Sequence, residues 1–268
     1  METSLARDLE IAVSAARRGS DAIRPWLGSL TGADFKGAVD PVTQADRESE
    51  SAIIATIRQA LPDDEILAEE SGGNPLELTR LWIIDPLDGT VNFLHQVPHV
   101  GVSVALYEHG LPRVGVVIDV FRDEIFTAAA GHGAFRNREP ISVSTQGDLG
   151  AALVATGFPY DRRTHAASYT AIVGEMLTHI QGIRRMGTAS LDLAWVACGR
   201  YDAFWELKLA PWDVAAGILL IREAGGRVTD PTGAPARPGD PAVVASNAAL
   251  EEAFRTTVAA AIPSGLLG

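Results

Sequence analysis

Five acidic residues in this sequence stand where carboxylates could do metal chemistry, and two of them anchor the pattern. Asp85 and Asp88 follow the apolar run at 81–84, in the stretch LWIIDPLDGTVNF. That run has the length and composition of a buried β-strand, and Pro86 predicts that the strand ladder stops there, with a turn at Asp88-Gly89. Close carboxylates raise each other's pKa unless a positive charge lies between them. A divalent metal ion would supply that charge; the alternative is an ordinary turn capped by Asp85.

Two more acids lie at the ends of predicted elements. Glu69 follows a short strand at 65–68, so neighbouring strand ends could present Glu69 and Asp85 to one point, although a solvated acidic loop has the same composition. Asp46 lies three residues after Thr43, which is the spacing of a capping box at a helix start. The simpler interpretation of Asp46 is a first-turn acid that the helix dipole favours.

The fifth acid, Asp213, follows Trp212 at the start of another predicted helix. Carboxylates without Cys or His at ligand spacing select hard ions, Mg²⁺ above all. The six histidines form neither an HExxH motif nor a ligand pair. We therefore expect an oxygen-donor site for Mg²⁺.

Composition limits the kinds of protein this can be. The chain has 268 residues, 47% apolar and 21% charged, which fits one large globular domain or two fused ones. A formal net charge of −12 argues against a nucleic-acid or anionic-membrane binder. Short basic clusters occur at Arg162-Arg163 and Arg184-Arg185. An acidic protein that handles an anionic substrate needs local positive charge, which metal ions would provide.

Features of targeting and redox chemistry point to the cytoplasm. Cys198 is the one cysteine, so no disulfide framework can form within the chain. The N-terminal stretch METSLARDLEIAV carries charges where a signal peptide would be apolar. No apolar run reaches the roughly 18 residues that a membrane span requires. We expect a cytoplasmic protein without a membrane partner.

The elements that must position the acids follow from periodicity. Helical spacing predicts helices at 4–28 and from Thr43 to about 61, and alternation predicts an antiparallel meander over 100–129. The second half alternates between strands and helices, expected at 152–156, 165–179, 183–186, 187–196, 201–207, 210–224, 242–245 and, after an Asn247 cap, up to about 261. The fold is thus mixed α/β. We expect a single domain over 1–268, with a soft internal division near 140–150 between a metal-loop half (1–145) and a substrate-pocket half (146–268).

These motifs together resemble a known family. WIIDPLDGTVNF at 82–93 resembles the first signature of the inositol monophosphatases, and WDVAAG at 212–217, followed by EAGG at 223–226, resembles the second. AEES at 68–71 and the pattern from Asp40 through Thr43 to Asp46 fit the remaining motifs in the right order. The resemblance covers about 36–230 and implies a layered αβαβα sandwich of the sugar-phosphatase type, an α+β arrangement in the broad sense.

The resemblance assigns roles residue by residue. Glu69 and Asp85, with the backbone carbonyl of Leu87, would hold a first Mg²⁺; Asp85, Asp88 and Asp213 would hold a second, and Glu69 would reach a third through water. Gly89 and Thr90 lie where the family binds phosphate, which suits N–H groups at a helix start. Thr90 and Glu69 would orient and deprotonate the attacking water, supported by Thr43 or Asp46, and Lys36 matches the family's lysine near the metal loop.

The implied reaction is in-line attack of metal-activated water on a phosphate monoester, without a phosphoenzyme. For the leaving alcohol, the resemblance points to Gly187, Thr188, Ala189 and Glu206, the last of which stands where inositol-hydrolysing members bind a hydroxyl. Pro211 departs from the residue that inositol enzymes usually have before the tryptophan. The resemblance therefore does not define the sugar pocket. Inositol 1-phosphate is the favoured substrate, and lithium sensitivity and a homodimer are implied.

Other functions compete with this one. A haloacid-dehalogenase-type phosphatase also uses a DGT motif, but its aspartates are two apart near the N-terminus, whereas here they are three apart at 85 and 88. Within the superfamily, histidinol phosphate, fructose 1,6-bisphosphate and 3′-phosphoadenosine 5′-phosphate are alternative substrates, although Asn92-Phe93-Leu94-His95 leans toward the inositol branch. A non-catalytic metal- or phosphate-binding protein is the third alternative, and the complete set of acids speaks against it.

Overall fold

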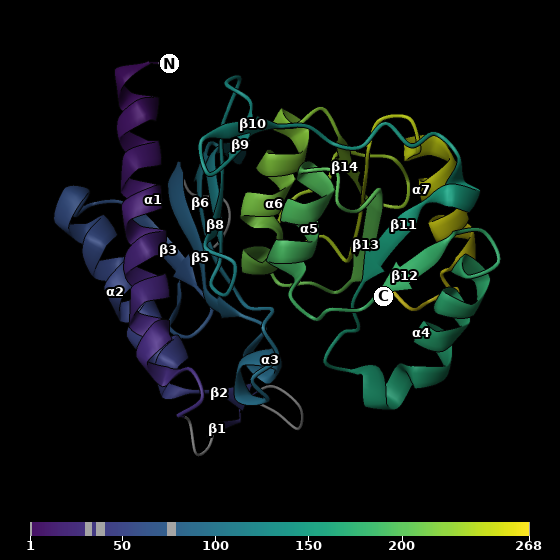
Figure 1. The fold of residues 1–268 in the computed structure, drawn as a ribbon, viewed down its shortest axis with the longest axis horizontal. Coiled ribbons are helices and arrows are strands. Elements are labelled where there is room, and N and C mark those ends of the chain that lie inside the picture. The colour runs from purple at the N-terminus through teal and green to yellow at the C-terminus, as the bar shows by residue number, and fades with distance from the viewer. Residues whose placement is uncertain (1, 30–33, 36–40, 74–78, 268) are drawn as a thin grey trace.

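The helices and sheets of this chain alternate in five layers, as the predicted αβαβα sandwich requires (Figure 1). The structure is a computed structural model, and it describes residues 2–29, 34–35, 41–73 and 79–267. Lys36 therefore lies outside the described residues. Among these residues, no helix is long and apolar enough to cross a membrane.

The first layer consists of two packed helices, α1 (Thr3–Ile23) and α2 (Gln44–Ala60). They cross closely at Gly19, where an added Cβ would lie 2.7 Å from the Ile53 side chain. Helix α1 was expected to reach residue 28, but it ends at Ile23 and continues as a short 3-10 turn, Arg24–Trp26. Pro25 explains the change, because it has no N–H for an α-helical hydrogen bond.

The second layer is an eight-stranded mixed sheet. Its order is β10-β9-β8-β7-β6-β5-β3-β4, and only β3 and β5 pair in parallel. The predicted meander is confirmed in its central strands, while β4, β9 and β10 were not expected. The strands are β3 (Glu65–Ala68), β4 (Gly72–Gly73), β5 (Arg80–Asp88), β6 (Gly101–Glu108), β7 (Leu111–Asp119), β8 (Glu124–Ala129), β9 (Ala134–Arg136) and β10 (Glu139–Ile141).

Strand β5 runs further than the sequence predicted. Pro86 was expected to stop the ladder, but pairing with β6 resumes at Asp88 after an irregularity that begins at Asp85. Pro86 and Leu87 lie in the unpaired part, where the missing proline N–H breaks no ladder hydrogen bond. The bulge brings both aspartates to the end of one strand.

The third layer, α5 (Ala189–Ala197) and α6 (Pro211–Glu223), is buried between the two sheets. Small residues permit this close packing. A Cβ at Gly115 of β7 would lie 2.9 Å from the Ala216 carbonyl oxygen, and one at Gly217 would lie 2.5 Å from the Leu193 side chain. The small-residue face of the meander thus receives a helix.

The last two layers are a five-stranded sheet and the helices α4 (Arg162–Met176) and α7 (Glu251–Ala261). The sheet order is β12-β11-β13-β15-β14. Its strands are β11 (Leu153–Thr156), β12 (Gly182–Arg184), β13 (Ala203–Leu207), β14 (Arg227–Thr229) and β15 (Ala242–Ser246). The expected alternation of strands and helices is confirmed; β14 was not expected.

Several short elements complete the chain, and one predicted cap was misplaced. They are β1 (Asp34–Phe35), β2 (Pro41–Val42), α3 (Thr90–Leu94) and the 3-10 turn Leu149–Ala151. Asn247 was expected to cap the last helix, but α7 begins at Glu251. Asn247 instead accepts a hydrogen bond from the Leu250 N–H at 2.9 Å, in the turn before the helix.

Candidate active site

A cavity of about 480 Å³ is lined by residues from the first sheet, the middle helices and the second sheet. Its lining contains most of the residues singled out from the sequence. They are Glu69, Asp85, Leu87, Asp88, Gly89, Thr90, Gly187, Thr188, Ala189, Glu206 and Asp213. Residues from separate parts of the chain therefore converge on one site.

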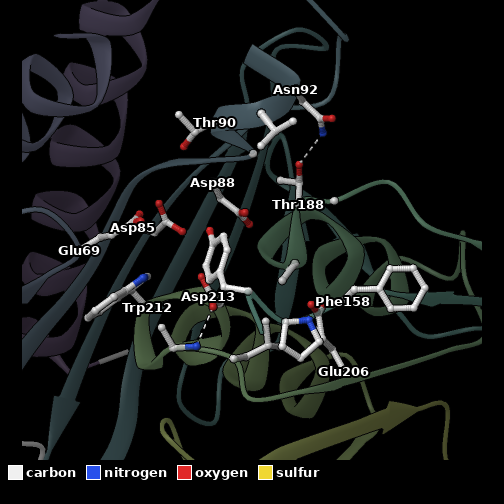
Figure 2. A pocket seen from close by; sticks show the side chains of 18 of the residues that line it. Glu69, Asp85, Asp88, Thr90, Asn92, Phe158, Thr188, Glu206, Trp212 and Asp213 are labelled. Carbon is white, nitrogen blue, oxygen red and sulfur yellow. Dashed lines mark hydrogen bonds between the residues drawn. The ribbon is translucent and has the colours of Figure 1, made fainter. Parts of the chain in front are cut away.

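The acidic wall of the cavity is assembled by two strands and a helix. Strands β3 and β5 pair so that Ala68 is opposite Ile84, and the residue after each, Glu69 and Asp85, faces the cavity (Figure 2). Asp88 follows at the end of β5, and Asp213 lies in the first turn of α6. The expectation that two adjacent strand ends present acids to one point is confirmed.

Hydrogen bonds from the backbone fix three of these carboxylates. Asp85 Oδ1 accepts from the Leu87 N–H at 3.1 Å, and Asp88 Oδ2 accepts from the Ser190 N–H at 2.7 Å, in the first turn of α5. Asp213 Oδ2 accepts from the Ala210 N–H at 2.7 Å, which closes the N-terminus of α6. In each carboxylate, one oxygen thus accepts a hydrogen bond from a backbone N–H.

The electrostatics of this wall favour a cation. Burial raises the pKa of Asp85 well above its usual range, and the negative charges of Glu69, Asp88 and Asp213 raise it further. Burial, followed by the charges of Asp88 and Glu69, likewise raises the pKa of Asp213. Burial raises the pKa of Asp88 to about 6 against the lowering effect of its Ser190 hydrogen bond. A positive ion among these groups would relieve both the repulsion and the loss of solvation.

The donor set fits a hard divalent ion by its chemistry, since it offers carboxylate oxygens and the Leu87 carbonyl but no sulfur or imidazole. Among the described residues, no three Cys, His, Asp or Glu side chains are arranged as a metal-binding group.

A helix start lies directly beside the acidic wall. Gly89 is the N-cap of α3 with φ +95°, a left-handed conformation that favours glycine. An added Cβ there would lie 2.5 Å from Thr188 Oγ1. Because α3 begins at Thr90, its first N–H groups have no partner within the helix.

Thr43 and Asp46 lie behind this helix start rather than in the cavity lining. The predicted capping box of α2 is confirmed: Thr43 Oγ1 accepts from the Ala45 N–H at 3.1 Å, and Asp46 Oδ2 accepts from the Thr43 N–H at 2.8 Å. The other oxygen of Asp46 accepts from Thr90 Oγ1 at 3.1 Å. Burial raises the pKa of Asp46, and the Thr43 hydrogen bonds oppose that rise.

A hydrogen-bond network that was not predicted from the sequence joins α3 to the start of α5. Asn92 Nδ2 donates to the His99 carbonyl at 2.9 Å and to the Met186 carbonyl at 2.8 Å, and it lies 3.2 Å from Thr188 Oγ1. Thr188 Oγ1 also donates to the His99 carbonyl at 3.0 Å. This network connects Asn92 and Thr188, which both line the cavity.

Glu206 lies on β13, across the cavity from the acidic wall (Figure 2). Burial raises its pKa to about 8, although the charge of Arg185 opposes this. Gly157 makes room for it, because an added Cβ would lie 2.1–2.3 Å from the Glu206 carboxyl atoms. The carboxyl can therefore accept a hydrogen bond from a hydroxyl in the cavity.

Other lining residues had no assigned role in the sequence analysis. They include Val91, Asn92, Phe158, Pro159, Tyr160, Arg162, Arg185, Lys208, Leu209, Ala210 and Trp212. Arg162 and Arg185 belong to basic clusters that the sequence made visible. Nothing in their spacing showed that both reach this cavity.

Comparison with known proteins gives one consistent result. The profile of the inositol monophosphatase family matches residues 4–263. The chain is 46% identical over 230 residues to the Escherichia coli K12 protein named Nus factor SuhB, covering 84% of this chain and 85% of that one. It is 43% identical to the inositol-1-monophosphatase of Synechocystis over 256 residues, covering 94% and 88% of the two chains.

A solved structure agrees with the fold. The inositol monophosphatase from Anabaena (Nostoc) sp. PCC 7120 superimposes with a TM-score of 0.87 at 41% identity, covering 97% of this chain and 98% of that one. The layered mixed α/β architecture is thus shared with this enzyme. The match over nearly the whole chain and the identity to these relatives establish that the chain belongs to the inositol monophosphatase family.

Proposed function

We propose that the protein is a Mg²⁺-dependent phosphatase that hydrolyses the phosphate monoester of a small polyol, with inositol 1-phosphate as the favoured substrate. One observation carries the proposal. Carboxylates from β3, β5 and the start of α6 meet beside the helix start at Gly89 and Thr90. A cation-binding wall next to the first backbone N–H groups of a helix suits a phosphate group.

In this proposal two to three Mg²⁺ ions are held by the acidic wall. Glu69, Asp85 and the Leu87 carbonyl would hold one; Asp85, Asp88 and Asp213 would hold the second, and Glu69 would reach the third through water. When bound, Mg²⁺ lowers the pKa of a water ligand and neutralises charge on the leaving oxygen.

The chain's own groups complete the chemistry. The N–H groups at Gly89 and Thr90 bind the phosphate oxygens, and the Thr90 hydroxyl, held by Asp46, orients the attacking water. Glu69 accepts a proton from that water. Glu206 accepts a hydrogen bond from a hydroxyl of the leaving alcohol. This direct displacement depends on positioning and charge rather than on a covalent intermediate.

Several further properties belong to the same proposal. The chain works as a single domain over residues 1–268 and as a homodimer in the cytoplasm, and lithium inhibits it. Lys36, Gly187 and Ala189 contribute to catalysis or to binding of the leaving group. The homodimer, the lithium inhibition and the roles of these three residues follow from the family resemblance, whereas the cytoplasmic location and the single domain rest on the composition and pattern of the sequence.

The test is phosphate release from inositol 1-phosphate, histidinol phosphate, fructose 1,6-bisphosphate and 3′-phosphoadenosine 5′-phosphate, with Mg²⁺ and after EDTA treatment. We expect Mg²⁺-dependent release, fastest from inositol 1-phosphate. Asp85→Asn should lower the rate by at least about a hundredfold while circular dichroism stays unchanged. Release that persists in EDTA, or a near-native rate in this variant, would contradict the proposal.

The E. coli relative is named a Nus factor. An assay of phosphate release does not test whether this chain has a role other than hydrolysis. The prediction that this chain binds no nucleic acid rests on its net charge of −12. Asp85→Asn separates the two roles, because a function independent of hydrolysis would survive in that variant. Mobility-shift assays with RNA and DNA at physiological salt test the exclusion directly.

A further inference from the structure

One residue of the active-site cavity has a backbone conformation that its residue type does not favour. Lys208 lines the cavity directly after β13 and has φ +55°, in the left-handed region. Glycine adopts this region readily, whereas a residue with a Cβ is strained there. Strain of this kind is concentrated at functional sites. The conformation therefore points to a role for Lys208 at the cavity.

The Lys208 side chain joins the end of β13 to the loop that precedes α4. Its Nζ lies 2.7 Å from Asp161 Oδ2, and its backbone N–H donates to the Pro241 carbonyl at 2.8 Å. The backbone of Lys208 is thus held by one contact and its ammonium group by another. Through the ion pair, Lys208 connects two segments that are 47 positions apart in the sequence.

Asp161 is fixed as firmly as Lys208. It is the N-cap residue of α4, but its side chain makes no capping hydrogen bond. One carboxylate oxygen accepts from Lys208, and the other accepts from the hydroxyl of Tyr169, a buried residue of α4, at 2.6 Å. Burial acts to raise the pKa of Asp161, but the hydrogen bonds and charges around it outweigh this effect and lower the pKa. Asp161 is therefore ionised at neutral pH and pairs with the Lys208 ammonium.

The loop at 157–161 is fixed to the end of β13 at both of its ends. At one end Gly157 packs against Glu206, since an added Cβ would lie 2.1–2.3 Å from the carboxyl atoms. At the other end Asp161 is paired with Lys208. The three residues between these two contacts, at 158–160, all line the cavity. The two contacts therefore determine where this wall of the cavity lies.

This loop lies on the side of the cavity where the leaving alcohol would bind. Figure 2 shows Phe158 and Glu206 on the side away from Glu69 and Asp85. Partly exposed ion pairs usually contribute little, because two long side chains must be ordered. Here both partners are already held by other contacts, so less conformational entropy is lost when the pair forms. The pair can therefore hold the loop in one position.

We infer that Lys208 is a positioning residue for the leaving alcohol, and that its ion pair with Asp161 holds the loop at 157–161 where this alcohol binds. The inference rests on the proposed phosphatase function and deepens it. Lys208 acts through the loop and takes no part in bond cleavage. Loss of the pair should therefore weaken binding of the substrate and leave the chemical step unchanged.

Kinetics of ion-pair variants test the inference, with the fastest ester of the substrate panel above, which we propose is inositol 1-phosphate. Lys208→Gln removes one charge, and Asp161→Asn removes the other but keeps an acceptor for Tyr169. In each variant KM should rise by at least about threefold while kcat stays within about twofold, because binding common to the ground and transition states is lost. The double variant should raise KM no further, since both changes remove the same contact.

Three further measurements distinguish positioning from a purely structural role. Lys208→Arg keeps the charge and should keep KM within about twofold of its native value. Lys208→Gly removes the backbone strain together with the charge, so KM should rise while the urea midpoint does not fall. Inhibition by inorganic phosphate should be unchanged in all variants, because phosphate binds at the acidic wall and the start of α3 in the proposed site.

A matched control is available at the same carboxylate. His165 Nδ1 also lies close to Asp161 Oδ2, at 3.2 Å, but His165 is not among the residues that line the cavity. His165→Gln should therefore leave both KM and kcat unchanged. A rise in KM in this variant as large as that in Lys208→Gln would show that any change around Asp161 has the same effect, and it would contradict a specific role for Lys208.

The outcomes separate this inference from the proposed function. A native KM in Lys208→Gln and Asp161→Asn would overturn the inference and leave the phosphatase function standing. A rise in KM that Lys208→Arg does not prevent, or that comes with equally weakened inhibition by phosphate, would also overturn it. If no ester of the panel released phosphate in Mg²⁺, the proposed function would fail, and the inference would fail with it.

Discussion

Thr90 Oγ1 donates a hydrogen bond to Asp46 Oδ1 at 3.1 Å, and this contact ties the first residue of α3 to the first turn of α2. The same Asp46 carboxylate closes the capping box with Thr43. One buried acid therefore serves both helix stability and the position of the Thr90 hydroxyl. Because Asp46 has both roles, the contact can be tested independently by enzyme kinetics and by urea denaturation.

Replacement of Thr90 separates the hydroxyl from the rest of the side chain. Thr90→Ala should lower kcat by at least about tenfold, because a positioned proton-transfer partner contributes that much or more. Thr90→Ser keeps the hydroxyl and should retain most of the rate. Steady-state kinetics with inositol 1-phosphate measures both, and equal rates for the two variants would show that the hydroxyl has no role.

Replacement of Asp46 should reduce stability as well as activity. Asp46→Ala removes the acceptor for the Thr43 N–H and for Thr90 Oγ1. We expect the free energy of unfolding to fall by about 1–3 kcal/mol. Urea denaturation measures the loss, and Gln44→Ala, at an exposed position of the same helix turn, provides the control. An unchanged urea midpoint would contradict the capping role.

The cavity acids should make the metal-free protein less stable as the pH rises. Burial raises the pKa of Asp88 from 3.8 to about 6 and that of Glu206 from 4.5 to about 8. Between the ordinary and the raised pKa of each group, the folded state binds more protons than the unfolded state. The free energy of unfolding therefore falls as the pH increases through this range. In EDTA, the decline in Tm between pH 4.5 and 8 should be smaller in Asp88→Asn and in Glu206→Gln than in the unmodified protein. A decline of the same size in all three proteins would contradict these shifts.

Magnesium should reverse this effect, because it binds the ionised carboxylates and competes with protons. The increase in Tm on addition of Mg²⁺ should therefore be larger at pH 8 than at pH 5. Differential scanning calorimetry at fixed ionic strength measures it, with the same concentration of potassium chloride as the control. An increase that does not depend on pH would mean that Mg²⁺ acts elsewhere.

Gly157 provides a substitution that acts through Glu206. A Cβ at this position would lie 2.1–2.3 Å from the Glu206 carboxyl atoms and must displace them. Gly157→Ala should therefore raise KM or lower kcat for inositol 1-phosphate by about tenfold or more, since misplacement of a positioning group is costly. Gly174→Ala is the control, because nothing lies within 4 Å of its added Cβ on α4. Native kinetics in Gly157→Ala would show that Glu206 does not contact the substrate.

The fold could be predicted where local patterns decide it. The capping box of α2 and the apolar run before Asp85 are short-range signals, and both led to correct elements. The end of β5 was predicted wrongly, because Pro86 fits a bulge against β6 that only the tertiary pairing reveals. Likewise, β14 is a short strand that exists through its pairing with β15.

The acids of the site could be named from sequence because each follows a strand or begins a helix, and the family resemblance assigned them roles. The two arginines that line the cavity could not be named in this way. Arg162 lies on α4 and Arg185 follows β12, 23 positions further along the chain, and neither belongs to a catalytic motif. Their convergence on one cavity depends on the tertiary fold, which no local signal encodes.

The most direct test of this account is a calorimetric titration of Mg²⁺ into EDTA-treated protein at pH 8, in the unmodified chain and in Asp85→Asn and Asp213→Asn. We predict saturable binding in the unmodified protein that is lost or weakened by at least about tenfold in both variants, because in the proposed site the two carboxylates share one ion. Binding that is unchanged in the variants, or absent from the unmodified protein with and without inorganic phosphate, would contradict it.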